Sequence, residues 1–425
     1  MADSNLSFVR LSGTAKRAVA PIVAARASTG RLVIPLFSNA GYLPFLRNLI
    51  CSMIRIQLDA WVVIAWDNAT CPGLLAPSII GAPSATPFCV FPYAGSTGVV
   101  TTERGIARYR TVSFNRMVLQ KPLWIEWLLQ QGYEVIQTDL DTVWLHNPLP
   151  LLHRLRVRPV RPNSSLREHP ITYLPSPSSP ASSPVDMLPE VAFQSEHAHG
   201  FNSGVFYARP TPGARLLLRV WIERLTELLS SNNVFEEQWA LNTALQRLRS
   251  ANAGGAASNG TGEGASTLAY GLLQDAHFPN GKIWWSYPWL ADKRAAYIVH
   301  ANWVQRGKKS RLVRDNLWQL DDTDERCATE YRLIARGCHK LCHPVLWAEP
   351  GSRVRVLKSC ASLNREDDRQ VRRRALKWAR NGTWGELRGT LWHPSAYHAL
   401  GHGCVRNTSV MAHAATVHRL VFGPQ

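Results

Sequence analysis

The chain has 425 residues, of which 45% are hydrophobic and 16 are Trp, so its composition excludes a disordered protein and favours a folded globular one. Its length exceeds the usual limit for one hydrophobic core, which predicts one large domain with additions or two domains. The 48 basic and 30 acidic residues give a net charge of +18, which favours anionic partners such as nucleotide phosphates, nucleic acid or an acidic surface.

Residues 1–30 are predicted to be a disordered or targeting leader. Basic residues at Arg10, Lys16 and Arg17 precede a short apolar run over 18–25, which Pro21 interrupts. No apolar run approaches the length of a membrane span, so no anchor is visible, although membrane association is compatible with the basic charge.

Glycosylation sequons indicate a secretory lumen, such as that of the Golgi, because six are more than chance favours. They begin at Asn5, Asn68, Asn163, Asn259, Asn381 and Asn407. Five of the eight cysteines lie in the last quarter of the chain, which indicates disulfides there: Cys327, Cys338, Cys342, Cys360 and Cys404. The run over 338–343, Cys-His-Lys-Leu-Cys-His, is an alternative zinc site, but it has no second ligand pair at a recognised spacing.

The first predicted unit is a strand over 31–37, a helix over 42–53 and a second strand over 61–66. Both strands are continuous apolar runs that end in polar turn residues, and the helix repeats its apolar residues at helical spacing. Strand, helix and strand at this spacing predict a βαβ unit and a parallel sheet.

The next unit carries the most informative motif. A helix over 114–130 is followed by a strand over 133–136, and then by Asp139 and Asp141, which are separated by Leu140. At a strand end, side chains at i and i+2 point the same way, so the two carboxylates converge. Paired oxygen ligands with room for water suit Mg²⁺ or Mn²⁺ bound against a diphosphate.

Three polar strand ends are predicted to share one edge of the sheet. Ligand sites of open α/β sheets lie beyond the carboxyl ends of the strands. Asn39, Asp67 and the pair Asp139 and Asp141 all fall at such ends.

The later part of the chain contains two predicted mobile insertions, over 159–190 and 251–266. Both are rich in small and polar residues, so they cannot bury enough apolar surface to order themselves. Between them we expect a strand over 201–207 and an amphipathic helix over 216–229. The predicted main domain is 31–320, and 321–425 is a cysteine-containing C-terminal extension.

Four segments occur in an order that resembles the nucleotide-diphospho-sugar transferase domain of glycosyltransferase family 77. They are Asn39-Ala-Gly41, Thr138-Asp-Leu-Asp-Thr-Val-Trp144 with Asn147-Pro148, Phe201-Asn-Ser-Gly-Val-Phe206, and His300-Ala-Asn-Trp-Val304 followed by Gly307-Lys308-Lys309. The resemblance implies a GT-A type fold, a Rossmann-like αβα sandwich with a mostly parallel central sheet. It also implies a retaining transfer of arabinose, xylose or galactose from a nucleotide-sugar donor, with Mn²⁺ or Mg²⁺ as cofactor. The implied acceptor is a cell-wall glycan or a hydroxyproline-rich glycoprotein.

The resemblance suggests roles for the charged residues. Asp141 is the better candidate for direct metal coordination, Asp139 contacts the ribose or the metal shell, and His300 is the third ligand as a neutral imidazole. Lys308 or Lys309 would neutralise the departing phosphate. The alternatives are a hydrogen-bonded core histidine and solvated lysines.

Further residues are expected to bind the donor or to take part in catalysis. Asn202, Ser203 and Gly204 can approach sugar hydroxyls, although the same residues commonly begin strands. The family usually has an Asp-Gln pair at the place of Glu237 and Gln238. This chain therefore departs from the family pattern in having Glu where Asp is usual. Lys121 is also expected to bind the donor, because it matches a lysine that recurs in the family. The alternative is that Lys121 is a charge on the exposed surface of a helix.

Two other classes of function compete with this interpretation. The stretch 135–143 also satisfies the first motif of haloacid-dehalogenase-like phosphatases, with Asp139 as nucleophile. Those enzymes usually carry the motif on their first strand, whereas at least two strands precede it here. A basic, non-catalytic nucleic-acid-binding protein would explain the charge but not the acidic pair, and the basic stretches lack interleaved aromatic residues, so nucleic acid is not the expected partner.

Overall fold

The computed structural model describes most of the chain up to residue 327. The described residues are 10–28, 30–75, 88–93, 111–157, 172–173, 187–196, 200–231, 236–255, 268–288, 290–291, 293–304, 307–321, 323–324 and 327. They fall into two compact units, which are described separately. The first lies within Met1–Gln274, Tyr297–His300 and Gln319–Ala328, and the second within Asp275–Ala296, Ala301–Trp318 and Thr329–Gln425.

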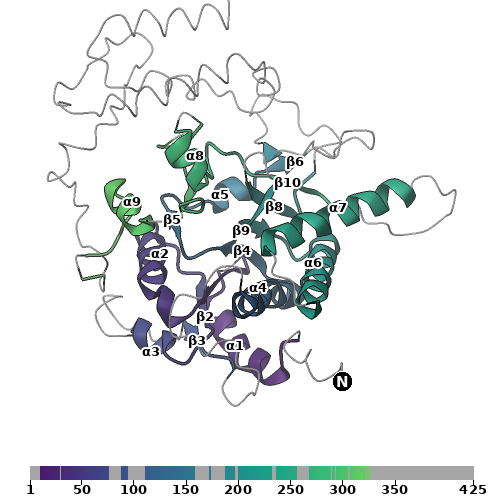
Figure 1. The fold of residues 1–425 in the computed structure, drawn as a ribbon, viewed down its shortest axis with the longest axis horizontal. Helices are drawn as coiled ribbons and strands as arrows, with labels where there is room; N and C mark the ends of the chain where they lie inside the picture. The colour runs from purple at the N-terminus through teal and green to yellow at the C-terminus, as the bar shows by residue number, and fades with distance from the viewer. Residues whose placement is uncertain are drawn as a thin grey trace, which may run out of the picture. The chain divides into compact units, whose positions relative to one another are not determined.

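A seven-stranded sheet forms the centre of the first unit (Figure 1). Its strand order is β10 (Tyr270–Leu272), β8 (Val191–Ser195), β9 (Phe201–Ala208), β4 (Glu134–Thr138), β1 (Leu32–Ser38), β2 (Trp61–Ala65) and β3 (Cys89–Val90). Strand β9 runs antiparallel to both of its neighbours, β4 and β8, and the other four pairings are parallel. The expected α/β class with a mostly parallel sheet is therefore confirmed.

Two short ribbons accompany the sheet. Strand β5 (Thr142–Trp144) pairs with β11 (Ile298–His300) in antiparallel register, and β6 (Arg156–Val157) pairs with β7 (Thr172–Tyr173). The β5–β11 ribbon brings residues more than 150 positions apart in the sequence into direct register.

Helices cover both faces of the sheet. They are α1 (Gly13–Arg26), the 3-10 helix η3 (Ala40–Tyr42), α2 (Leu43–Arg55), α3 (Thr70–Leu75), α4 (Val112–Gln130), α5 (Leu149–Leu152), α6 (Pro212–Ser230) and α7 (Glu237–Gly255). Threonine or serine caps begin three of them: Ser12, Thr111 and Thr211 each accept a hydrogen bond from the backbone N–H three residues later.

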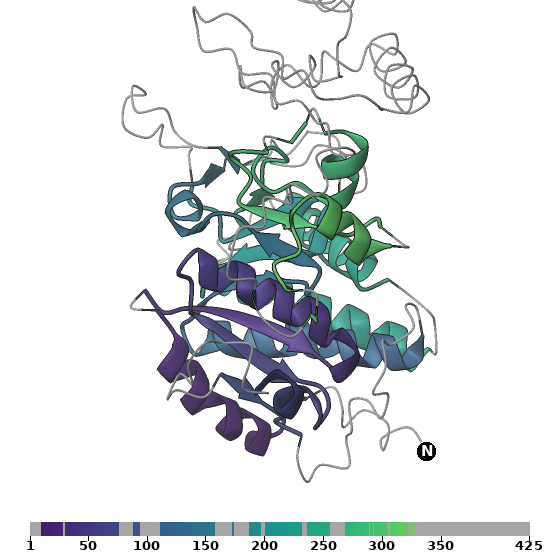
Figure 2. The same cartoon turned by 90° about the vertical axis from the view of Figure 1, so that its left-hand side faces the viewer.

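The hydrophobic core follows the alternation of side chains along each strand. Val33 and Phe37 of β1, and Val62 and Ile64 of β2, face the same cluster as buried side chains of α1, α4, α6 and α7. Helix α2 packs against β1 and β5, and Figure 2 shows it on the side of the sheet opposite α1. Trp124 of α4 is wholly buried in the shared cluster.

The predicted elements up to α6 agree with the structure within a few residues, except at the amino-terminal end. Residues 13–26, within the predicted leader, form α1, because Ala15, Val19 and Val23 lie on one helical face and pack into the core. Most of the two predicted insertions lies outside the described residues. Within them, Thr172–Tyr173 forms β7, and 251–255 continues α7.

Two disulfides occur among the described residues. Cys327 pairs with Cys51 of α2, and Cys71 of α3 pairs with Cys89 of β3. The sequence indicated disulfides within the C-terminal extension, whereas Cys327 instead joins the extension to α2, because tertiary folding brings these distant residues together. Cys338, Cys342, Cys360 and Cys404, with the alternative zinc run, lie outside the described residues.

The second unit contains α8 (Gly281–Ser286) and α9 (Lys308–Arg314). Both indole N–H groups of Trp284 and Trp285 donate to Asp315 Oδ2 at 2.9 Å, which connects α8 to the end of α9. In the part of the chain that is described, no helix combines the length and apolarity that crossing a bilayer requires.

Candidate active site

The turn between β4 and β5 carries the two aspartates. The Asp139 N–H donates to Gly204 O at 2.7 Å, and the Thr142 hydroxyl donates to Asp139 O at 2.8 Å. The turn is therefore held both by β9 and by its own following strand. This arrangement directs Asp139 and Asp141 beyond the carboxyl end of β4, as the sequence predicted.

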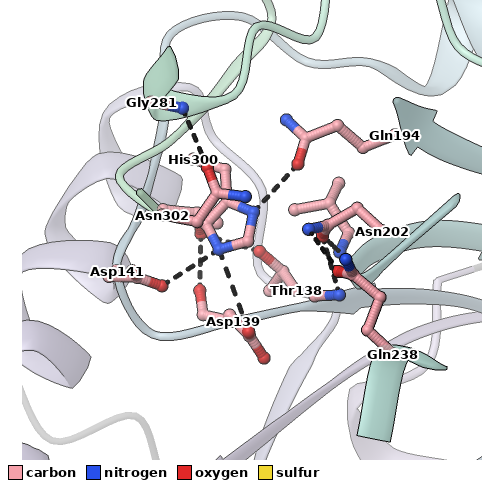
Figure 3. Close-up of polar contacts among 12 residues, drawn as sticks. Thr138, Asp139, Asp141, Gln194, Asn202, Gln238, Gly281, His300 and Asn302 are labelled. Carbon is pink, nitrogen blue, oxygen red and sulfur yellow. Dashed lines mark hydrogen bonds and ion pairs between the residues drawn. The ribbon is translucent and has the colours of Figure 1, made fainter. Parts of the chain in front are cut away.

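His300 reaches the same place through the β5–β11 ribbon. It pairs in register with Thr142, so its buried ring lies against the turn of the two aspartates. Its Nε2 atom is 3.2 Å from Asp141 Oδ1 and 3.8 Å from Asp139 Oδ2 (Figure 3). One ligand atom from each of these three residues lies within 4.8 Å of the others, which is a spacing that can hold a metal ion.

The donor set fits a divalent cation. Two carboxylates and one imidazole supply the oxygen and nitrogen ligands that Mn²⁺ accepts, and the oxygens also suit Mg²⁺. Burial by itself lowers the pKa of His300, but Asp141 and Asp139 outweigh it and raise that pKa above its ordinary value. The same excess of negative charge that stabilises the imidazolium would favour a bound cation.

Gly204 has a steric role at this site. A Cβ atom at this position would lie 2.5 Å from Asp139 Oδ2 and 2.6 Å from His300 Cε1. We expected the missing side chain to admit a ligand, and in the structure the space admits the aspartate and the histidine ring themselves. Ser203 is buried beside it in β9.

A second group of charges adjoins Asp139. The buried Lys121 of α4 places Nζ 2.7 Å from Asp139 Oδ1 and 3.7 Å from Glu237 Oε2. Burial lowers the pKa of Lys121, but the two carboxylates outweigh it and raise that pKa overall. Lys121 is thus a fully charged ion-pair partner and not the exposed helix charge that was its alternative interpretation.

Glu237 is a buried carboxylate whose polar atoms are only partly satisfied. Burial raises its pKa to about 7, and the attraction of Lys121 only partly opposes this. Its Oε1 atom is buried and has no hydrogen-bond partner among the described residues. A buried, unpaired carboxylate oxygen is costly, which is typical of a functional position.

Asn202 organises the neighbouring polar group. Its amide nitrogen donates to Glu196 Oε2 at 2.6 Å and to Gln238 Oε1 at 2.9 Å. Its amide oxygen accepts hydrogen bonds from the N–H groups of Gly204 and Val205. Asn202 therefore connects the start of β9 to Gln238 of α7.

Asn39 and Asp67 lie at the ends of β1 and β2, which are adjacent parallel strands. Asp67 Oδ2 accepts from Ala40 N at 2.8 Å, and Asp67 Oδ1 accepts from Ala69 N and from both N–H and hydroxyl of Thr70. Through these bonds Asp67 stabilises the start of α3 and holds the backbone that follows β1. Its role in donor binding stays a prediction.

Lys308 and Lys309 belong to the second unit, at the first turn of α9. Lys309 Nζ lies 5.2 Å above the Trp318 ring, in a cation–π contact. Their expected interaction with phosphate stays a prediction.

Three residues at the site were missed by sequence interpretation. Gln194 Oε1 lies 2.9 Å from His300 Nδ1, and the Glu196 carboxylate accepts from Asn202. Tyr42 of η3 has its pKa raised by burial, and Lys121, Asp141 and Asp139 also act on it. The only sequence signal for Gln194 and Glu196 is that polar residues stand at alternate positions at the end of the buried strand β8.

Comparisons with known proteins show which family this chain resembles. The model of the nucleotide-diphospho-sugar transferase family matches residues 57–314. The UDP-D-xylose:L-fucose alpha-1,3-D-xylosyltransferase MGP4 of Arabidopsis thaliana is 27% identical over 297 residues, which are 66% of this chain and 68% of the relative. The beta-arabinofuranosyltransferase RAY1 of the same plant is 22% identical, over 71% of this chain and 50% of the relative. The solved galactosyltransferase LgtC, in complex with donor and acceptor sugar analogs, is 11% identical with a TM-score of 0.35, over 66% of this chain and 93% of that one.

Proposed function

Because this chain belongs to the nucleotide-diphospho-sugar transferase family, we propose that it transfers a sugar from a nucleotide-diphosphate donor with the help of a divalent cation held by Asp139, Asp141 and His300. The family assignment confirms the expectation of a nucleotide-sugar-dependent glycosyltransferase. The observation that supports the cation is the convergence of three ligand atoms within 4.8 Å, from a turn and from a strand far along the chain.

A bound cation would stabilise the charge that develops on the diphosphate leaving group. The protein side chains would position the ligands of the cation and balance their charge. Asp139 is held by Gly204 and Lys121, so its carboxylate is fixed before a cation arrives. Lys121 also partly neutralises the negative charge of Asp139 and Glu237.

The sequence motifs supply the proposed donor-binding and catalytic residues. We assign Asn39, Asp67, Lys121, Asp139, Ser203, Gly204, Lys308 and Lys309 to the donor, and Asn202, Glu237 and Gln238 to catalysis. The contacts Asn202–Gln238 and Lys121–Glu237 support the second group, because each holds a side chain of the first turn of α7 against another element.

The names of the relatives support a pentose as the transferred sugar. One relative is named for transfer of xylose from UDP-D-xylose to L-fucose, and another for transfer of arabinofuranose. We infer that this chain uses a UDP-pentose, or galactose, and transfers it with retention to a cell-wall glycan or hydroxyproline-rich glycoprotein. The two disulfides and the sequons support a secretory compartment, such as the Golgi.

The test is release of free nucleotide from a panel of UDP-sugars, with and without Mn²⁺. Asp141→Asn is expected to abolish Mn²⁺-dependent turnover of every donor and to keep the wild-type unfolding midpoint. Asp59→Asn, at an exposed position away from the site, is the matched control and should behave as wild type. Undiminished turnover in Asp141→Asn, or hydrolysis of a generic phosphate ester without any turnover of UDP-sugars, would contradict the proposal.

A further inference from the structure

We propose that Gln194 is a positioning residue that selects the tautomer of His300 in which Nε2 is free to bind a cation. The inference rests on the proposed function, because it gives His300 the role of a cation ligand. It adds to the site a residue that belongs to none of the motifs that carry the family resemblance.

The hydrogen-bond chemistry at His300 defines the tautomer. Gln194 is wholly buried, and its amide oxygen, Oε1, lies 2.9 Å from His300 Nδ1. An amide oxygen only accepts hydrogen bonds, so in this orientation of the amide Nδ1 carries the proton. In the neutral ring the lone pair is then on Nε2, which is the atom that faces Asp141 and Asp139 (Figure 3).

The acidic pair by itself favours the opposite tautomer. With Nε2 only 3.2 Å from Asp141 Oδ1, an Nε2–H group would donate to this carboxylate and leave no lone pair for a cation. Gln194 opposes this, because the Nε2–H tautomer would place the lone pair of Nδ1 against the lone pairs of Oε1. A hydrogen bond from the second ring nitrogen is the general way in which a ligand histidine is oriented.

The backbone explains why this side chain is available. The β8–β9 ladder changes register between Phe193 and Ser195, so Phe193 pairs with Phe206 and Ser195 pairs with Phe201. Gln194 thus lies opposite the irregular stretch of β9 that contains Asn202 and Gly204. Such irregularities redirect side chains at functional sites. Because Phe193 belongs to the core cluster, Gln194 points to the other face of the sheet, where His300 lies.

The experiment measures Mn²⁺ affinity by calorimetric titration of the full chain in four variants. Gln194→Leu is expected to weaken Mn²⁺ binding about 10- to 100-fold. Gln194→Glu keeps an acceptor oxygen and should stay within about 3-fold of wild type or bind more tightly. Gln137→Leu makes the same change at a buried position of β4, where neither polar side-chain atom has a partner in the described structure, and should leave affinity unchanged. His300→Ala tests the ligand itself.

A second readout needs no substitution at Gln194. In wild-type protein labelled with ¹⁵N-histidine, at a pH above the titration of the ring, the His300 resonances should show the Nδ1–H tautomer; His300→Ala identifies them. This measurement decides the question if Gln194→Leu fails to fold.

The outcomes separate the two proposals. If His300→Ala binds Mn²⁺ as wild type does, the proposed cation site is wrong. If His300→Ala binds weakly but folded Gln194→Leu binds normally, or if His300 carries its proton on Nε2, only the role of Gln194 is wrong. A loss in Gln194→Glu as large as in Gln194→Leu would also contradict it.

Discussion

At the scale of single residues, the site is governed by an uneven balance of charge. Lys121 is shared by Asp139 and Glu237, and it lies nearer to Asp139 by 1.0 Å, from 2.7 and 3.7 Å. Glu237 thus has the weaker partner, in addition to a buried oxygen with no hydrogen bond. Glu237, which stands where the family usually has Asp, is therefore a carboxylate whose burial disfavours its ionised form.

This imbalance predicts a pH-dependent stability difference for Glu237→Gln. The pKa of Glu237 is raised from its ordinary 4.5 to about 7 by burial, so its contribution to stability is full below pH 4.5 and is lost as pH rises through about 7. The uncharged glutamine avoids this loss. From about pH 5 to about pH 8 the free energy of unfolding of the variant should therefore rise relative to wild type, by up to about 3 kcal/mol.

Denaturant unfolding of both proteins at the two pH values measures this difference. Glu236→Gln, one position earlier, is the control for the change in net charge. A difference between wild type and Glu237→Gln that does not vary with pH would refute the prediction.

At the scale of elements, one side chain attaches α7 to the start of β9. Asn242 Oδ1 accepts from Phe201 N, and Asn242 Nδ2 donates to Phe201 O, both at 2.9 Å. The amide thus satisfies both backbone groups as a neighbouring strand would. Position 200 requires glycine, because the φ angle of Gly200 is +102° and a Cβ atom there would clash with Asn242 Oδ1.

The same contact orients the catalytic candidates. Asn242 Nδ2 also donates to Gln238 O at 2.8 Å, one helical turn earlier in α7. The first turn of α7, which carries Glu237 and Gln238, is therefore held against the strand that carries Asn202.

We expect Asn242→Leu to lower the free energy of unfolding by about 2–3 kcal/mol, because it leaves the N–H and C=O groups of Phe201 without partners. Chemical denaturation measures the loss. Thr243→Ala removes a more exposed hydroxyl bonded to Trp239 O on the same helix, and should change stability by less than about 0.5 kcal/mol. Equal effects of the two substitutions would show that the amide bridge contributes nothing.

At the scale of the whole molecule, the two disulfides found among the described residues close loops of very different length. Cys51 and Cys327 are 276 residues apart in the sequence, and Cys71 and Cys89 are 18 apart. A cross-link restricts the unfolded chain more when the loop is longer. Cys51–Cys327 also attaches the end of the described chain to α2, which packs against β1 and β5.

Replacing Cys51 and Cys327 together by serine should therefore cost more stability than replacing Cys71 and Cys89. In the chain-entropy model the two losses are roughly 6 and 3 kcal/mol. Calorimetric or denaturant unfolding under oxidising conditions measures both, and each pair is the matched control of the other. A larger loss for the short loop would mean that native contacts, not the unfolded chain, dominate the effect.

Much of the fold and part of the site could be predicted from the chain alone. The strands at 32–38, 61–65 and 134–138 are continuous apolar runs, and the helices at 43–55 and 112–130 repeat apolar residues at helical spacing. The antiparallel insertion of β9 beside β4 could not be predicted, because its apolar residues satisfy either direction of pairing. Helix α1 was missed because its buried stripe consists of only three small or β-branched residues.

The sequence by itself determined that Asp139 and Asp141 directly follow a buried apolar strand, since such a run is a local property. Their convergence comes from the turn between β4 and β5 and not from the alternation along a strand that the sequence suggested. Only the tertiary structure decided that His300 completes this pair, that Gln194 and Glu196 support it, and that Cys51 meets Cys327. Each of these depends on the pairing of strands or on contacts between residues far apart in the chain. Such contacts are selected by the packing of the whole core, and no short stretch of sequence encodes them.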